Sequence, residues 1–180
     1  DLGAPHQVSL VPGNHDAYTR RAVPATKRAW HEYMTGDSAD PTDDMARFPY
    51  IRRRGPLALI GVSSAIATAP FMATGRVGHA QRKRLRAMLE TLQDSSLFRI
   101  VLIHHPPLPA KGDRFRRLLD GPEFCKVVAR AGADLVIHGH DHNSTVGHIE
   151  RDGIRIPVIG VPSASALKSG EKPATAYNLY

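Results

Sequence analysis

The sequence predicts a single α/β domain. Short apolar runs alternate with stretches whose apolar residues recur at helical spacing, which is the pattern of strands connected by helices. A length of 180 residues is enough for one domain with a substantial core. No internal repeat or change of composition marks a second domain.

The first third of the chain predicts a strand, a helix and a pair of strands. Residues 6–12 form a short apolar run that ends at a proline, so we expect a strand there. Residues 24–34 have helical spacing, with a proline in the first turn, where a missing N–H costs little. Residues 48–65 predict two strands joined by a turn at Gly55 and Pro56.

The middle of the chain predicts two helices that alternate with two buried strands. Residues 78–93 and 121–132 have helical spacing, and the second of these segments ends at a glycine. Residues 97–107 and 133–139 contain nearly continuous apolar runs, which are typical of strands covered on both faces. The apolar face of the first helix is expected to consist of Leu85, Met88, Leu89 and Leu92.

The remainder of the chain predicts β-structure. Residues 144–165 contain short β runs with a turn at Asp152 and Gly153. Residues 175–180 are expected to form a last strand.

The chain is basic, with 24 Lys and Arg against 17 Asp and Glu and a net charge of +7. Basic residues cluster at 51–55, 81–86 and 113–117, which is compatible either with binding to phosphates or nucleic acid or with a solvated surface. Aromatic residues make up 6% and do not alternate with the basic runs as a base-stacking surface would require. The solvated surface is therefore the favoured interpretation.

Some classes of protein are excluded by composition. One cysteine, Cys125, rules out a disulfide framework within the chain and any zinc site with several thiolates. No apolar stretch approaches the length of a membrane-spanning helix. The chain begins with Asp1 and not Met, so we expect the natural N-terminus, with any targeting signal, to lie upstream. We expect a cytoplasmic protein.

Polar side chains gather where three predicted strands end. In open α/β sheets ligands bind at the carboxyl ends of the strands, so these segments are expected to converge on one edge. Imidazoles and an amide carbonyl, without thiolates, suit Zn, Fe or Mn. The three groups are Asn14, His15 and Asp16; His104 and His105; and His140, Asp141 and His142.

The motifs in these three segments resemble a known family. "VPGNHDAY", "LIHHPPLP" and "HGHDH" are similar, in this order, to motifs of the calcineurin-like metallophosphoesterases, and most of all to the bacterial class III cyclic-nucleotide phosphodiesterases. The resemblance extends from about residue 8 to about residue 165. It implies two β-sheets sandwiched between helices, an α-β-β-α arrangement with a two-metal site at the strand ends.

Two motifs of that family, Asp-x-His and Gly-Asp-x-x-Asp, are expected ahead of "VPGNHDAY", and neither occurs there in this sequence. We therefore interpret residues 1–180 as the C-terminal portion of a single calcineurin-like phosphoesterase domain whose N-terminal β–α units are missing. The first Asp of the Gly-Asp-x-x-Asp motif bridges the two metals in the family. The chain as given is accordingly expected to be a poor catalyst.

The resemblance also implies metal ligands. It makes Asn14, His104 and His140 ligands of one metal ion and His142 a ligand of the other. The cofactors would be two divalent or trivalent ions, Mn, Fe or Zn. Gly139 is expected to give the backbone room to turn between the histidines that flank it.

Further roles are implied for the residues beside these ligands. His15 would contact the phosphoryl group without binding metal, stabilising its charge or protonating the leaving alkoxide. Asp16 would hold the His15 imidazole in the required tautomer. His105 and His138 are favoured as packed structural residues.

The function implied is hydrolysis of a phosphodiester or phosphomonoester by a water molecule that two metals activate. The substrate would be a small phosphoester, and the sequence leaves the particular compound and the oligomeric state open. Two alternatives remain. One is a nuclease of the same superfamily, if the basic runs line a groove beside the metals. The other is a non-catalytic interaction module on the same fold.

Overall fold

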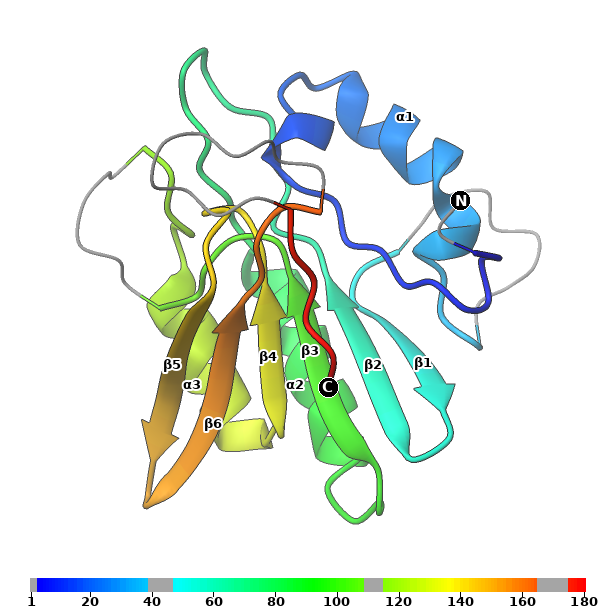
Figure 1. The fold of residues 1–180 in the computed structure, drawn as a ribbon, viewed down its shortest axis with the longest axis vertical. Coiled ribbons are helices and arrows are strands. Elements are labelled where there is room, and N and C mark those ends of the chain that lie inside the picture. Colours follow the sequence, from blue (N-terminus) through cyan, green and yellow to red (C-terminus); the bar gives the residue numbers. More distant parts are fainter. Residues whose placement is uncertain (1–2, 39–46, 109–114, 165–174) are drawn as a thin grey trace.

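A mixed six-stranded β-sheet organises the molecule (Figure 1). The structure is a computed structural model, and it describes residues 3–38, 47–108, 115–164 and 175–180. The strands are β1 (Tyr50–Arg54), β2 (Leu57–Val62), β3 (Phe98–Ile103), β4 (Leu135–His138), β5 (Thr145–Arg151) and β6 (Ile154–Gly160). The helices are α1 (Ala22–Ala29), α2 (His79–Thr91) and α3 (Gly121–Ala131), with short 3-10 helices η1 (Asn14–Asp16) and η2 (His31–Tyr33).

The order of the strands in the sheet is β1-β2-β3-β4-β6-β5. The four central strands, β2, β3, β4 and β6, are parallel to one another, and the two edge strands run antiparallel to their neighbours. The carboxyl ends of the four central strands therefore meet at one edge, at the top of Figure 1. This is the edge at which a ligand site is expected in a parallel sheet.

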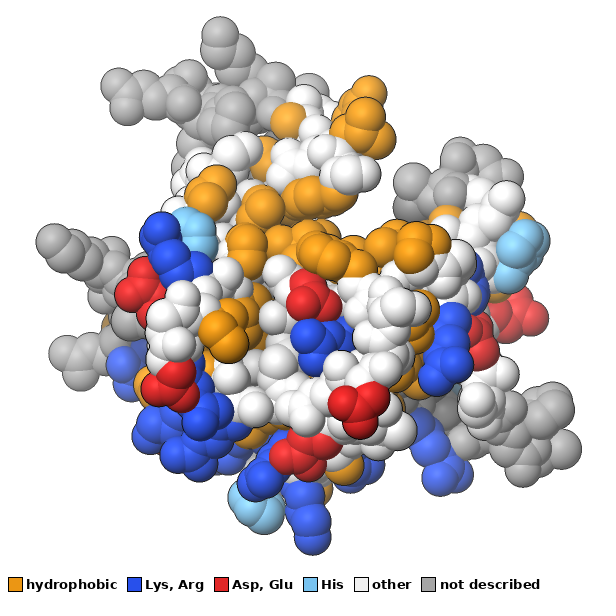
Figure 2. All heavy atoms as spheres, turned by 90° about the horizontal axis from the view of Figure 1, so that it is seen from below, with side chains coloured by type: hydrophobic (Ala, Val, Ile, Leu, Met, Phe, Trp, Pro, Cys, Tyr) orange, Lys and Arg blue, Asp and Glu red, His pale blue; other side chains and the backbone are white. Residues whose placement is uncertain are grey.

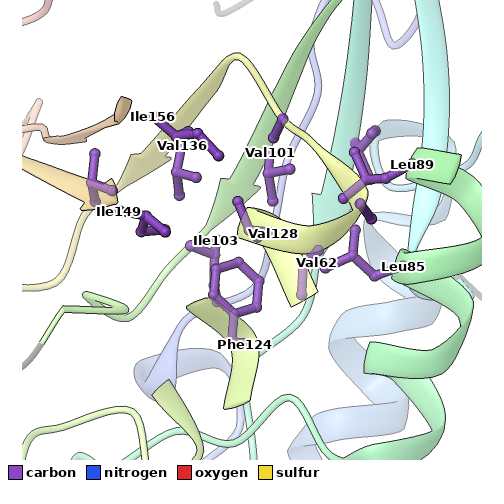
Figure 3. Packing of buried hydrophobic residues seen from close by; sticks show 14 of the residues in the cluster. Val62, Leu85, Leu89, Val101, Ile103, Phe124, Val128, Val136, Ile149 and Ile156 are labelled. Atoms are coloured by element: carbon purple, nitrogen blue, oxygen red, sulfur yellow. The ribbon is translucent and has the colours of Figure 1, made fainter. Parts of the chain in front are cut away.

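The core lies between one face of the sheet and helices α2 and α3 (Figure 3). Its members from the helices include Leu85, Leu89, Phe124 and Val128, each fully buried. The predicted α/β class is confirmed. The described strands form one sheet, with both long helices on the same face, and alternate residues on the opposite face, such as Leu59, are only partly buried.

Most predicted elements are present. The turns at Gly55-Pro56 and at Asp152-Gly153 connect β1 to β2 and β5 to β6 as expected. The helix predicted at 24–34 begins instead at Ala22 and ends at Ala29, and its continuation is the 3-10 helix η2. The strand predicted at 175–180 is wrong, because those residues form no strand and are largely exposed.

The strand predicted at 6–12 is also wrong, since residues 6 and 7 lie in a turn and residues 8–12 belong to no strand. Side chains from elsewhere in the chain donate hydrogen bonds to the backbone carbonyls of this N-terminal segment instead. The guanidinium of Arg52 donates hydrogen bonds of 2.5 to 2.7 Å to the carbonyls of Pro5, Val8, Glu32 and Thr35. Arg52 is 3% exposed, so this buried cation ties the N-terminal segment to β1.

The basic clusters are partly used in such structural contacts. Besides Arg52, Arg54 pairs with Asp37, Arg82 pairs with Asp120, and Arg84 donates to the carbonyl of Phe48. Figure 2 views the end of the molecule opposite the strand carboxyl termini, and there acidic side chains lie among the basic ones. In the described part of the chain, no helix is long and apolar enough to cross a bilayer.

Candidate metal centre

Three of the predicted ligands meet at the carboxyl ends of β3 and β4. Oδ1 of Asn14 lies 3.0 Å from Nε2 of His104 and 3.2 Å from Nδ1 of His140. The two ring nitrogens lie 3.2 Å apart. His104 follows β3 directly, His140 follows β4, and Asn14 begins η1, so three separate segments of the chain supply the three donor atoms.

The spacing of these donors fits a metal ion. Zinc and similar ions bind nitrogen and oxygen at about 2 Å, which places neighbouring ligand atoms about 3 Å apart. An amide oxygen and two imidazole nitrogens are suitable donors for Zn, Fe or Mn. The predicted convergence of Asn14, His104 and His140 is therefore what the structure shows, whereas their binding of an ion remains a prediction.

The electrostatics of the cluster keep its imidazoles neutral. Burial, followed by the neighbouring His140, lowers the pKa of His104 from the usual 6.5 to about 4. Burial likewise lowers the pKa of His140. Neutral imidazole is the form that binds metal. Nε2 of His140 is buried, and no hydrogen-bond partner meets it in the part of the chain that the structure describes.

The close approach of Asn14 to His104 depends on Gly13. A Cβ atom at Gly13 would lie 2.6 Å from Cε1 of His104, a distance that carbon atoms do not tolerate. The N–H of Gly13 donates to Oδ2 of Asp16 at 2.8 Å, which closes the short η1 turn. Gly13 thus lets the segment pass over the His104 ring, and Asp16 holds the turn that presents Asn14.

The turn after β4 differs from the expectation for Gly139. The backbone angle φ is positive at His140 (74°) and His142 (56°), not at Gly139. Residues other than glycine rarely adopt this left-handed backbone conformation, and those that do cluster at functional sites. A Cβ at Gly139 would meet only Nδ1 of His104, at 3.8 Å. The two predicted ligands carry the strained conformation themselves.

His142 lies apart from the three converging residues. It is exposed, and it is not among the described histidines whose nitrogens approach one another. This position is compatible with a ligand of a different ion, and its role stays a prediction.

His15 is exposed beside Asn14, and its side chain contacts Tyr18. The Tyr18 hydroxyl lies 3.4 Å from Nε2 of His15, and the two rings pack edge to face at 5.0 Å. Asp16 was expected to orient the His15 imidazole. Oδ2 of its carboxylate accepts the hydrogen bond from Gly13, so the structure gives Asp16 a role in the turn, and its effect on His15 stays a prediction.

His105 lies near the cluster but its nitrogens are engaged elsewhere. Donor atoms of His104, His105 and His140 all lie within 4.8 Å of one another. However, Nε2 of His105 donates to the carbonyl of Ala73 at 3.1 Å, and Nδ1 lies 2.7 Å from the Ser64 hydroxyl. Burial lowers the pKa of His105 to about 3. These contacts support the structural role favoured for His105.

His138 is buried at the end of β4, with 6% of its surface exposed. Its Nδ1 donates to the carbonyl of Gly139 at 3.0 Å, and burial lowers its pKa. It lies below the donor cluster as a packed residue, as expected.

The sequence profile of the calcineurin-like phosphoesterases matches residues 1–144. The chain belongs to the calcineurin-like phosphoesterase family. The matched segment contains every candidate site residue, from Asn14 to His142. No curated protein is significantly similar to the chain.

Membership of the calcineurin-like phosphoesterases associates the donor cluster with metal-dependent hydrolysis of phosphoesters. Two residues at this calcineurin-like site were not anticipated from the sequence, Tyr18 and Ser64. Tyr18 is four positions after Asn14, so its place at the end of the same motif was a signal that could have been used. Ser64 follows β2 and contacts His105 from 41 positions away, which no local pattern reveals.

Proposed function

We propose that the protein hydrolyses a phosphodiester or phosphomonoester with a water molecule activated by two metal ions. The observation that carries the proposal is the meeting of Asn14, His104 and His140, whose donor atoms lie 3.0 to 3.2 Å apart in a chain of the calcineurin-like family. Mn, Fe and Zn are the candidate ions, since the donors are nitrogen and oxygen.

Asn14, His104 and His140 would hold one ion, and His142 would bind the second. When bound, two such ions lower the pKa of a water molecule and neutralise charge on the phosphoryl oxygens. The three converging side chains come from different segments, so their role is to fix the position of the first ion against the sheet. The burial of His104 and His140 keeps both rings in the neutral form.

His15 would contact the substrate itself. Its side chain is exposed next to Asn14, so a phosphoryl group near the ion would be within its reach. A hydrogen bond from the imidazole to a phosphoryl or leaving-group oxygen stabilises the charge that develops there. Asp16 would orient the His15 imidazole through its carboxylate, whose Oδ2 also accepts the hydrogen bond that closes the η1 turn.

Of the residues that the family resemblance assigns to the second ion, this chain contains His142, and neither an Asp-x-His nor a Gly-Asp-x-x-Asp motif precedes Asn14. We therefore propose that this chain binds one ion weakly, because none of its three converging donors is a carboxylate that would offset the charge of the ion, and that it turns over slowly. Slow turnover follows because no carboxylate of these motifs fixes a second ion beside the first.

The test is hydrolysis of bis-p-nitrophenyl phosphate and p-nitrophenyl phosphate by the purified chain with Mn²⁺, Fe²⁺, Zn²⁺ or Co²⁺. We expect slow release of nitrophenol that EDTA abolishes and that the variant His104→Ala lacks. The variant His31→Ala, which alters a histidine on η2, is the matched control and should retain the wild-type rate. If the chain binds metal but releases no nitrophenol with any of the four metals, the proposal is overturned and the non-catalytic interaction module is favoured.

A further inference from the structure

The Tyr18 hydroxyl lies between a proposed metal ligand and the proposed substrate-contacting histidine. It accepts a hydrogen bond of 2.9 Å from Nδ2 of Asn14, and it lies 3.4 Å from Nε2 of His15. Tyr18 is 40% exposed, and its ring packs edge to face against the His15 ring. One side chain therefore contacts two residues with different proposed roles.

The bond to Asn14 determines which end of its amide faces the cluster. An amide can bind an ion only through its oxygen, because its nitrogen carries two hydrogens and offers no lone pair. With Nδ2 donating to Tyr18, Oδ1 faces Nε2 of His104 and Nδ1 of His140. Without the hydroxyl, the Asn14 amide loses the acceptor that holds Nδ2 away from the cluster, so the orientation with Oδ1 facing the cluster is no longer favoured over the one with Nδ2 facing it.

The bond to His15 determines where that imidazole carries its proton. The Tyr18 oxygen already accepts from Asn14, so its own O–H is available to donate to Nε2 of His15. A neutral imidazole that accepts at one nitrogen carries its hydrogen on the other. This places the hydrogen of His15 on Nδ1.

We propose that Tyr18 is a positioning residue that sets both the amide orientation of Asn14 and the tautomer of His15, leaving Nδ1–H of His15 to donate to a phosphoryl oxygen. The last step rests on the proposed function, whereas the first two are properties of the chain by itself. Partners that orient metal ligands in this way are typically worth about 10- to 100-fold in metal affinity or activity.

The first experiment compares Tyr18→Phe with the wild-type chain in affinity for Mn²⁺, measured by calorimetry without substrate. The substitution removes the hydroxyl and keeps the ring, so packing against His15 is retained. We expect a loss of affinity of about tenfold or more. Tyr33→Phe is the matched control, because its hydroxyl bonds to the carbonyl of Gly3 away from the site, and it should bind Mn²⁺ as the wild type does.

The second experiment gives its decisive result in the wild-type chain. Nitrogen-15 NMR of the metal-free wild-type chain reports which ring nitrogen of His15 carries the hydrogen. We expect the Nδ1–H form to predominate in the wild type and in Tyr33→Phe, and its share to fall in Tyr18→Phe. A predominant Nε2–H form in the wild type would overturn the assignment for His15 even if Tyr18→Phe were poorly folded.

The two proposals fail in different ways. Equal Mn²⁺ affinity in wild type and Tyr18→Phe would overturn the positioning of Asn14, whatever the rate of turnover. If the affinity and the tautomer behave as expected but no phosphoester is hydrolysed, Tyr18 still positions both residues and the proposed function is the part that is wrong.

Discussion

The hydroxyl oxygen of Ser64 lies 2.7 Å from Nδ1 of His105, and neither side chain is exposed to solvent. Because Nε2 of His105 already donates to Ala73, the Ser64 hydroxyl is the partner of the remaining nitrogen. This pair fixes the segment that follows β2 against the end of β3. It also completes the hydrogen bonding of both His105 nitrogens, although the ring lies beside those of His104 and His140.

We expect Ser64→Ala to lower the free energy of unfolding by about 1–3 kcal/mol, because a buried ring nitrogen loses its partner. Bound metal should be unchanged. Urea unfolding and metal analysis of the same sample check both expectations. Ser63→Ala is the control, since Ser63 contacts Gln81 through its backbone. Loss of metal from Ser64→Ala alone would show that this pair belongs to the binding site.

His15 and His140 should respond differently to replacement by alanine. His15→Ala is expected to lower kcat by about 10²–10⁴, the range for a positioned acid–base group, with metal content nearly unchanged. His140→Ala should lose metal, because Nδ1 of His140 is one of the three converging donors. Metal analysis after dialysis, together with the rate on bis-p-nitrophenyl phosphate, separates the two. Equal loss of metal from both variants would contradict this division of roles.

The glycines of the two motifs should differ in their tolerance of a side chain. Gly13→Ala places a carbon 2.6 Å from Cε1 of His104, so the ring must move and Mn²⁺ affinity should fall by at least tenfold. Gly139→Ala meets only Nδ1 of His104 at 3.8 Å, an ordinary contact, and should bind Mn²⁺ within a few-fold of the wild type. Calorimetric titration of both variants is the measurement, and a reversed order of affinities would refute the geometry described for Gly13.

The metal-free chain should lose stability in mild acid. The pKa values of His104 and His105 are lowered to about 4 and about 3, while the unfolded chain titrates near 6.5. Between these values the unfolded state binds more protons, so the stabilisation present above pH 6.5 is lost as the pH falls toward 4. Urea midpoints at pH 7.5, 6.0 and 5.0 should decrease in that order. A midpoint that is constant over this range would contradict the neutral, buried state of both rings.

The sequence predicted those parts of the fold whose periodicity reflects burial. Helix α2 was recognisable because Leu85 and Leu89 recur on one face, and β3 and β4 because apolar runs end at histidines. The segment 6–12 was misassigned as a strand because an apolar run does not reveal what satisfies its backbone. Here that partner is Arg52, a residue more than 40 positions away.

The candidate site shows the same division. The sequence predicted that Asn14, His104 and His140 would converge, because each follows an apolar run that was interpreted as a strand, although only the runs before His104 and His140 are strands in the structure. The contact of Asp16 with Gly13 and the hydrogen bonds of Tyr18 depend on side-chain orientation within a single turn. Such orientation is settled by competition among nearby donors, which a motif does not specify.

Asn14 and His104 are 90 positions apart in the chain, and Asn14 and His140 are 126 apart. An ion held by all three would act as a removable cross-link between the N-terminal segment and the sheet. By mass action, a ligand that binds only the folded state and is present at 100 times its Kd adds about 2.7 kcal/mol to stability. The resistance of the chain to unfolding would then be set by the free concentration of metal around it, so that chelation acts on the whole fold and not on catalysis alone.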